Sequence, residues 1–213
     1  MYKAIFWDND GVLVNTEPLY FESTKKVLAE VDVELTMDYY INQNLKYSRS
    51  CFNLARDKGF SEEEIQQIRQ KRNVLYADML RKNVIVMDGV RETLENLHGK
   101  VMMGIVTSSC KFHLDIILDS NGLRKYFDFI VTIDDVKKGK PDPDAYLLAL
   151  KKSSHKSENC LVIEDTERGV EAAKAANLSC FAIPNELSKS NNFSKADKIL
   201  KSTREVPRLV LNI

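Results

Sequence analysis

Short apolar runs alternate along this chain with stretches in which apolar residues recur at helical spacing. The first run, residues 4–7, ends at Asp8-Asn9-Asp10-Gly11, which is typical of a buried strand that leads into a loop. Later runs predict further strands at residues 101–106, 129–133, 161–163, 180–183 and 198–200. Helices are expected between them at residues 112–120, at 143–152 and in an alanine-rich stretch that ends at Ala176.

Residues 16–83 follow a different pattern, because apolar positions at helical spacing are separated by dense Glu and Lys. Ser61 and Glu64 form a capping-box signature directly before the apolar residue Ile65. We therefore expect this segment to be a small helical bundle inserted after the first strand.

Strands that alternate with helices predict an α/β fold with a Rossmann-like parallel sheet flanked by helices. The inserted bundle is expected to form a small α-helical cap (lid) domain, residues 16–83, and residues 1–15 and 84–213 are expected to form the Rossmann-like core. Ligands of such sheets bind outside the carboxyl ends of the strands. Residues 188–194 are polar except for one phenylalanine and are expected to form a surface loop.

The composition limits the classes of function. Lys and Arg number 31 and Asp and Glu number 31, so the formal net charge is zero, which argues against binding of nucleic acid or membranes by bulk charge. The four cysteines are far apart and favour reduced thiols over a zinc site or a disulfide framework. The early acidic residues and the lack of an apolar run of ~18–20 residues predict a cytoplasmic protein, and a monomer is the default expectation.

Polar residues follow four of the predicted strands, where a ligand would bind. In chain order they are Asp8 with Asp10, Thr107 with Ser108, Lys140, and Glu164 with Asp165. Two carboxylates ~4 Å apart repel by about 4 kcal/mol at an effective dielectric constant of ~20, so four acids with one lysine need a cation. Carboxylate oxygens suit Mg²⁺. With Mg²⁺ bound and Asp10 protonated the charges cancel, a phosphate dianion can approach, and metal-assisted phosphoryl transfer is expected.

The spacing of Asp8 and Asp10 allows both side chains to point the same way as the chain leaves the strand. One carboxylate can then attack phosphorus while the other moves protons. Each motif alone also has a simpler explanation: a turn for Asp-Asn-Asp-Gly, helix caps for Thr107-Ser108 and Glu164-Asp165, and surface exposure for Lys140. The order and spacing of the four motifs together favour a phosphoryl-transfer site.

Four segments resemble, in order, the motifs of the haloacid dehalogenase superfamily. They are Phe6-Trp7-Asp8-Asn9-Asp10-Gly11-Val12-Leu13-Val14-Asn15-Thr16-Glu17-Pro18-Leu19, Ile105-Val106-Thr107-Ser108-Ser109, Lys138-Gly139-Lys140-Pro141-Asp142-Pro143 and Val162-Ile163-Glu164-Asp165-Thr166-Glu167-Arg168-Gly169. The resemblance covers nearly the whole chain and includes a helical cap after the first motif. Within the superfamily, the chain is most similar to the β-phosphoglucomutase and small-sugar-phosphatase branch.

This resemblance implies a role for each matching residue. Asp8 would be the nucleophile that forms a phosphoaspartyl intermediate, Asp10 the general acid and base, and Lys140 the balance for negative charge. Phosphate would be bound by Thr107, Ser108 and Ser109. Mg²⁺ would be bound by Asp165, Asp8 and the Asp10 backbone carbonyl, and Glu164 would either bind Mg²⁺ directly or contact one of its ligands. In the cap, the substrate would be bound by Ser48-Arg49 and Arg72.

The leading hypothesis is a Mg²⁺-dependent phosphatase that hydrolyses a small phosphorylated metabolite, either a sugar phosphate or a phosphorylated acid. A β-phosphoglucomutase-like isomerase is the alternative, although Tyr20 stands where the mutases have a histidine and Lys46 lies in a cap loop that often carries glycine. A third hypothesis is a non-catalytic metal-binding or interaction protein on the same scaffold. Accumulation of free phosphate distinguishes the phosphatase from the mutase.

Overall fold

The computed structural model describes residues 2–47 and 49–211, which divide into two compact units. The first, the core unit, comprises Met1–Asn15 and Ile85–Ile213. The second, the helical unit, is the inserted segment Thr16–Val84.

The described part of the core unit contains a six-stranded sheet in the order β5-β4-β1-β6-β7-β8, and all neighbouring strands are parallel. Trp7 at the end of β1 lies level with Ile105 in β4 and Ile163 in β6, so these three central strands end at one edge of the sheet. The strands are β1 Ala4–Trp7, β4 Met102–Val106, β5 Phe129–Val131, β6 Cys160–Glu164, β7 Ser179–Ala182 and β8 Lys198–Ile199, and a separate antiparallel pair joins β2 Val14–Asn15 to β3 Ile85–Val86.

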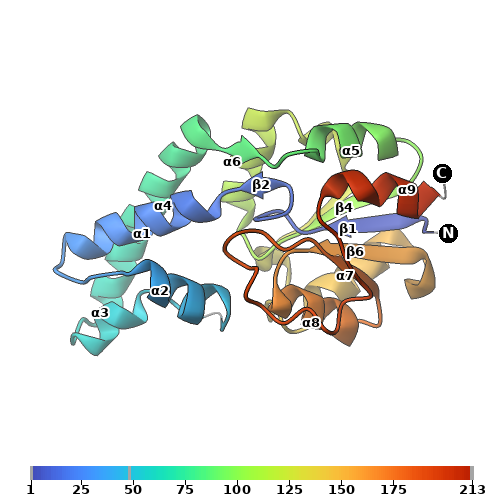
Figure 1. The fold of residues 1–213 in the computed structure, drawn as a ribbon. Coiled ribbons are helices and arrows are strands. Elements are labelled where there is room, and N and C mark those ends of the chain that lie inside the picture. The colour runs from blue at the N-terminus through green and yellow to red at the C-terminus, as the bar shows by residue number, and fades with distance from the viewer. Residues whose placement is uncertain (1, 48, 212–213) are drawn as a thin grey trace. The chain divides into compact units, whose positions relative to one another are not determined.

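Helices cover both faces of this sheet, and Figure 1 shows α5 and α9 on one side with α7 and α8 on the other. Their bounds are α5 Val90–Leu97, α6 Lys111–Asn121, α7 Asp144–Ser153, α8 Glu167–Ala175 and α9 Val206–Leu211, with 3₁₀ turns at Arg124–Tyr126, Ile133–Asp135, Ser157–Asn159 and Thr203–Glu205. This arrangement confirms the predicted α/β class with a parallel sheet flanked by helices.

The central strands are buried on both faces, which is why they are continuous apolar runs instead of alternating ones. Every residue of β1 and of β6 is buried. Phe6 in β1 packs edge-on against Phe129 in β5, with ring centroids 5.8 Å apart. A Cβ on Gly104 in β4 would lie 2.3 Å from the Phe129 ring, so a glycine leaves the room for this packing.

The helical unit has the bounds α1 Glu17–Ala29, α2 Met37–Tyr39, a π-helical segment Tyr40–Leu45, α3 Asn53–Asp57 and α4 Glu62–Asn83. The predicted capping box begins α4, because the Ser61 backbone N–H donates to Glu64 Oε2 at 2.8 Å and the Glu64 N–H donates to Ser61 Oγ at 3.3 Å. None of the helices in the described residues is long and apolar enough to cross a membrane.

Ile133 is not part of β5, although the apolar run extends to it. The Asp135 carboxylate accepts hydrogen bonds from the backbone N–H of Thr132 at 2.8 Å and from its hydroxyl at 2.9 Å. These bonds turn the chain into the 3₁₀ segment Ile133–Asp135, so β5 ends at Val131, two residues earlier than the apolar pattern predicts.

Two further local features differ from the sequence-based expectation. Helix α5 was not predicted, although its buried residues Val90, Leu94 and Leu97 recur at helical spacing. The expected surface loop at residues 188–194 is wrong in part, because Ser188 and Phe193 are buried.

Candidate active site

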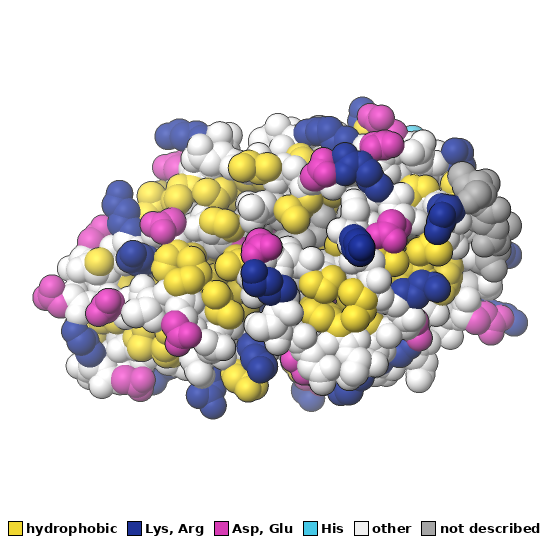
Figure 2. Space-filling model, in the orientation of Figure 1, with side chains coloured by type: hydrophobic (Ala, Val, Ile, Leu, Met, Phe, Trp, Pro, Cys, Tyr) yellow, Lys and Arg dark blue, Asp and Glu magenta, His cyan; other side chains and the backbone are white. Residues whose placement is uncertain are grey.

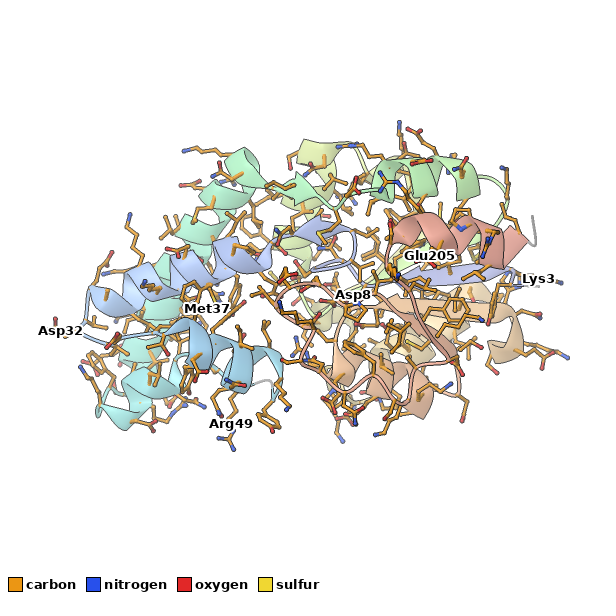
Figure 3. The ribbon with its side chains drawn as sticks, in the orientation of Figure 1. Lys3, Asp8, Asp32, Met37, Arg49 and Glu205 are labelled. Atoms are coloured by element: carbon orange, nitrogen blue, oxygen red, sulfur yellow. The ribbon has the colours of Figure 1, made fainter. Side chains whose placement is uncertain are left out.

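Asp8 lies directly after β1, at the edge where the three central strands end. Its backbone N–H donates to the Ile163 carbonyl at 3.0 Å, which continues the pairing of β1 with β6 by one residue. The residue is 7% exposed, and Figure 3 labels it in the core unit. The sheet therefore fixes the position of this carboxylate and buries it.

Lys140, in the loop before α7, is the buried cation at this edge. Its Nζ donates to Asp8 Oδ1 at 2.6 Å, to Glu164 Oε1 at 2.6 Å and to the Val106 carbonyl at 2.9 Å. An ammonium has three protons to donate. All three are therefore used, and two carboxylates share one positive charge.

Glu164, the last residue of β6, is fully buried, and both of its carboxylate oxygens have protein donors. Oε1 accepts from Lys140 Nζ and, at 2.8 Å, from the Tyr146 hydroxyl. Oε2 accepts from the backbone N–H groups of Asp165 and Thr166 at 3.1 and 3.4 Å and from the Thr166 hydroxyl at 3.2 Å. These bonds hold the carboxylate from two sides.

Burial and the shared lysine determine which of these groups are charged. Burial raises the pKa of Asp8 to about 8, because desolvation and the charges of Glu164 and Asp10 outweigh the attraction of Lys140. Burial opposes the charge on Glu164 too, but Lys140 and its hydrogen-bond donors outweigh it and lower the pKa of Glu164. For Lys140, the two carboxylates outweigh burial and raise the pKa. Lys140 and Glu164 are thus a charged pair, and full ionisation of Asp8 at neutral pH needs a further positive charge.

Asp10 is half-buried and is held by the loop after β4. Its Oδ2 accepts from the Thr107 hydroxyl at 3.1 Å and from the Ser109 hydroxyl at 2.8 Å. The Ser109 backbone N–H donates to Thr107 Oγ1 at 3.0 Å, and Ser108 is half-buried between them in the chain. Two of the three hydroxyl residues predicted to bind phosphate therefore contact the Asp10 carboxylate.

Asp165 contacts the turn at Gly11. Gly11 has a φ of 88°, which residues with a side chain rarely adopt, and a Cβ there would lie 2.2 Å from Asp165 Oδ2. The same oxygen accepts a hydrogen bond from Asn185 Nδ2 at 2.7 Å. A glycine at position 11 is thus what lets the turn after β1 approach the Asp165 carboxylate.

The carboxylates of Asp8, Glu164 and Asp165 fit a divalent cation. All three residues are buried, and one ligand oxygen from each lies within 4.8 Å of the others. An all-oxygen donor set suits Mg²⁺, and three buried acids around one lysine leave an excess of negative charge. Asp8 and Asp165 are the ligands that the geometry favours, because both Glu164 oxygens already accept from protein donors.

Arg72, predicted to bind substrate, lies on α4 of the helical unit and is 7% exposed. The carbon of its guanidinium lies 4.3 Å from the centroid of the Tyr20 ring and 5.7 Å from that of Phe52. Its Nε and Nη1 have no hydrogen-bond partner among the described residues. The guanidinium is therefore stacked on aromatic rings and retains donors for an acceptor group.

Arg49, the other basic residue predicted to bind substrate, is exposed in the helical unit, where Figure 3 labels it. Its Nη1 donates to Gln43 Oε1 at 3.1 Å. The preceding residue, Ser48, lies outside the described residues. The surroundings of Arg49 thus differ from those of Arg72, and they are those of a solvated side chain.

Tyr146 and Asn185 are in the site although the sequence pattern does not point to them. Tyr146 occupies an apolar position of α7, which indicates a core residue. Asn185 is one polar residue in a loop, and asparagine is common in turns. The one available signal is that Asn185 follows a parallel strand, β7, as the predicted site residues follow theirs.

Known proteins resemble this chain over most of its length. The family model described as haloacid dehalogenase-like hydrolase matches residues 5–183. The phosphorylated carbohydrates phosphatase of Thermotoga maritima is 33% identical over 181 residues, which cover 83% of this chain and 82% of that protein. The fructose-1-phosphate phosphatase YqaB of Escherichia coli is 26% identical over 177 residues, which cover 83% of this chain and 94% of that protein.

Among solved structures, CbbY from Rhodobacter sphaeroides in complex with phosphate has a TM-score of 0.83 to this chain. The two chains are 23% identical, and the match covers 97% of this chain and 96% of that one. At this identity the likeness concerns the fold, and it extends through both units of the chain.

Proposed function

Because the chain belongs to the haloacid dehalogenase-like hydrolase family, we propose that it is a Mg²⁺-dependent phosphatase that works through a phosphoaspartyl intermediate on Asp8. The family match and the phosphatases among the relatives show the general activity, which is hydrolysis of small phosphorylated metabolites. The proposal adds the cation, the intermediate and the substrate class, a sugar phosphate or a phosphorylated acid.

One observation carries the proposal: Lys140 binds Asp8 and Glu164 in a buried cluster that also contains Asp165. Burying several charges is costly, and strongly perturbed pKa values of this kind gather at functional sites. A carboxylate nucleophile beside a lysine and a cation site is the arrangement that attack on a phosphate ester requires.

The chemistry proceeds in two steps. In the first, an Asp8 oxygen forms a bond to phosphorus, the bond from phosphorus to the leaving oxygen breaks, and Asp10 donates a proton to that oxygen. In the second, water attacks phosphorus, Asp10 takes the proton of the water, and the bond between Asp8 and phosphorus breaks to release phosphate.

The surrounding residues prepare these steps. The Thr107 and Ser109 hydroxyls orient Asp10, and the positively charged ammonium of Lys140 lies against the Asp8 carboxylate. Mg²⁺, when bound by Asp8, Asp165 and the backbone carbonyl of Asp10, supplies charge neutralisation for the phosphoryl oxygens.

In the same proposal the helical unit acts as a lid and selects the substrate through Arg49 and Arg72. Arg72 gives this the stronger support, because a buried guanidinium whose Nε and Nη1 lack acceptors among the described residues is costly. A carboxylate, phosphate or hydroxyl oxygen of the substrate that accepts from it would offset this cost.

Phosphate release from a panel of phosphorylated sugars and phosphorylated acids tests the proposed function. We expect Mg²⁺-dependent turnover of at least one compound, and no turnover with EDTA or with Asp8→Asn, which keeps the side-chain volume but removes the nucleophile. Asp119→Asn is the control, because this α6 carboxylate is 65% exposed, and full activity is expected. Wild-type turnover in Asp8→Asn, or no Mg²⁺-dependent release from any compound, would contradict the proposal.

The same assay tests the isomerase alternative. A mutase would convert a hexose monophosphate into its isomer without net release of phosphate, whereas we expect sustained release and no isomer. The ring of Tyr20 packs in the helical unit against Tyr40 and Tyr76, with centroids 6.2 and 5.4 Å apart. These contacts support a packing role for the residue that replaces the histidine of the mutases.

A further inference from the structure

Asn185 lies on the loop after β7, outside the four motifs, and its side chain contacts two parts of the proposed cation site. Nδ2 donates to Asp165 Oδ2 at 2.7 Å and to the Gly11 carbonyl oxygen at 3.3 Å. The loop after β7 thereby reaches both the residue that follows β6 and the turn that follows β1.

The loop determines which end of the Asn185 amide faces Asp165. Oδ1 accepts from the backbone N–H groups of Leu187 at 2.9 Å and Ser188 at 3.2 Å. The backbone N–H of Asn185 donates to Ser188 Oγ at 3.0 Å. Because two donors hold Oδ1, the NH₂ end must point at Asp165 and Gly11, and the amide uses its full hydrogen-bonding capacity.

These contacts restrict the Asp165 carboxylate. A Cβ added at Gly11 would lie 2.2 Å from Asp165 Oδ2 and 2.7 Å from Asn185 Nδ2, so the turn, the carboxylate and the amide are closely packed. Asp165 is also one of the three buried acids whose ligand oxygens lie within 4.8 Å of one another. A neutral donor therefore orients a metal ligand without adding negative charge to the cluster.

We propose that Asn185 is a positioning residue that sets the Mg²⁺ affinity of the site by holding Asp165. This inference rests on the cation of the proposed function and on none of its reaction steps. Replacing a residue that hydrogen-bonds to a metal ligand typically lowers the metal affinity by about 10- to 100-fold. Asn185 acts through Asp165, so the effect of its replacement is expected in the binding of Mg²⁺ to the substrate-free chain.

Calorimetric titration of the full chain with Mg²⁺, without substrate, tests the inference directly. In Asn185→Ser, the serine oxygen can still accept from backbone N–H groups of the loop, but it is too short to reach Asp165. We expect the Kd for Mg²⁺ to rise by about 10- to 100-fold, and Asn185→Ala to show the same rise.

Ser188→Ala is the matched control. It removes the oxygen that accepts from the Asn185 backbone N–H and leaves the bond from Nδ2 to Asp165 in place. We expect a wild-type Kd, and thermal unfolding in EDTA verifies that each variant is folded.

Two results would overturn the inference. An unchanged Kd in Asn185→Ser would show that the amide does not hold the ligand, and an equal rise in Ser188→Ala would assign the effect to order in the loop. Different results would contradict the cation site of the proposed function. These are a wild type that binds no Mg²⁺, or an Asp165→Asn variant that binds Mg²⁺ as tightly as the wild type. Either result would also contradict the inference about Asn185.

Discussion

At the scale of single residues, the site depends on how donors are shared between two carboxylates. Asp8 Oδ1 and Glu164 Oε1 both accept from Lys140, and Glu164 Oε1 also accepts from the Tyr146 hydroxyl. Burial and the neighbouring carboxylates raise the pKa of Tyr146, so the hydroxyl keeps its proton and donates it. The Tyr146 hydroxyl thus limits how strongly Glu164 draws Lys140 away from Asp8.

We expect Tyr146→Phe to lower kcat about fivefold, because a hydrogen bond of about 1 kcal/mol is lost and Lys140 shifts toward Glu164. KM for the phosphorylated substrate should stay unchanged, since the hydroxyl donates to Glu164 and has no part in the proposed substrate contacts. Steady-state kinetics at saturating Mg²⁺ measure both constants.

Tyr126→Phe is the matched control for this change. The Tyr126 hydroxyl also donates to a glutamate, Glu95 Oε1, at 3.2 Å, but this bond is not among the contacts of the site. Its kcat should equal that of the wild type. Equal losses in the two variants, or a change in KM alone, would contradict the role given to Tyr146.

At the scale of elements, α8 packs directly behind Glu164, and a glycine makes this approach possible. A Cβ on Gly169 would lie 2.0 to 2.1 Å from the carboxyl atoms of Glu164. Glu164 cannot move aside without losing its bonds to Lys140 and Tyr146. The distance between helix and sheet is therefore coupled to the geometry of the site.

For Gly169→Ala, helix propensity alone predicts stabilisation by about 1 kcal/mol, but overpacking costs about 1–3 kcal/mol. We expect the overlap to dominate and the free energy of unfolding to fall, as measured by urea unfolding. In a double-mutant cycle with Glu164→Asp, whose shorter side chain leaves room, the cost should shrink. A stabilised Gly169→Ala protein would refute the coupling.

The edge strand β8 is joined to β7 by Asp197, which precedes it. Asp197 Oδ2 accepts from the Cys180 backbone N–H at 2.7 Å and from Lys174 Nζ at 2.8 Å. Burial opposes its charge, but these bonds outweigh it and lower the pKa of Asp197 below the ordinary 3.8. Such a carboxyl stabilises the fold above its unfolded pKa, and the contribution is lost as the pH falls through the folded pKa.

Asp197→Asn should lower the free energy of unfolding near neutral pH by about 1 kcal/mol, a modest loss because 42% of the side chain is exposed. The gap between wild type and variant should narrow as the pH falls below 3.8 and close once the pH is below the lowered pKa of the folded state, where both side chains are neutral. Urea unfolding at a series of pH values measures this gap.

Asp142→Asn serves as the control for the strand connection. Its carboxylate pairs with Lys138 on the surface at 3.4 Å, so the variant should change the free energy of unfolding by less than about 0.5 kcal/mol. A gap for Asp197→Asn that widens toward acid pH would contradict the lowered pKa.

At the scale of the whole molecule, the zero net charge is an average over very different places. On the face shown in Figure 2, Lys and Arg side chains are interspersed with Asp and Glu. The interior of the core unit instead holds Asp8, Glu164 and Asp165 with Lys140. Negative charge thus exceeds positive charge in this cluster, where repulsion is least screened.

Removal of Mg²⁺ should therefore lower the stability of the entire chain. A cation that binds the folded chain alone stabilises it by about 2.7 kcal/mol at a concentration of about 100 times Kd. We expect the Tm of the wild type to rise when Mg²⁺ is added and to return to its Mg²⁺-free value with EDTA. The Tm of Asp165→Asn should not change when Mg²⁺ is added. Differential scanning calorimetry measures these shifts. A wild-type Tm that is independent of Mg²⁺ would contradict the cation site.

Much of the fold and many site residues could be predicted from local patterns. Continuous apolar runs predict buried parallel strands because both faces of such a sheet are covered, and the observed β1, β4 and β6 follow those runs. The polar residues after these strands meet at one edge because parallel strands end together, as the contacts of Lys140 with Asp8 and Glu164 show.

The sequence by itself determined the strands of the parallel sheet, the fold class and the candidate acids, because periodicity and strand-end chemistry are local properties of a chain. Tertiary structure alone decided that Ser109 holds Asp10, that Tyr146 holds Glu164 and that Asn185 holds Asp165. The two residues of each bond are 18 to 99 positions apart in the sequence and belong to different elements or loops. Whether two such groups come within hydrogen-bond distance depends on how the whole core unit packs, and no local pattern records it.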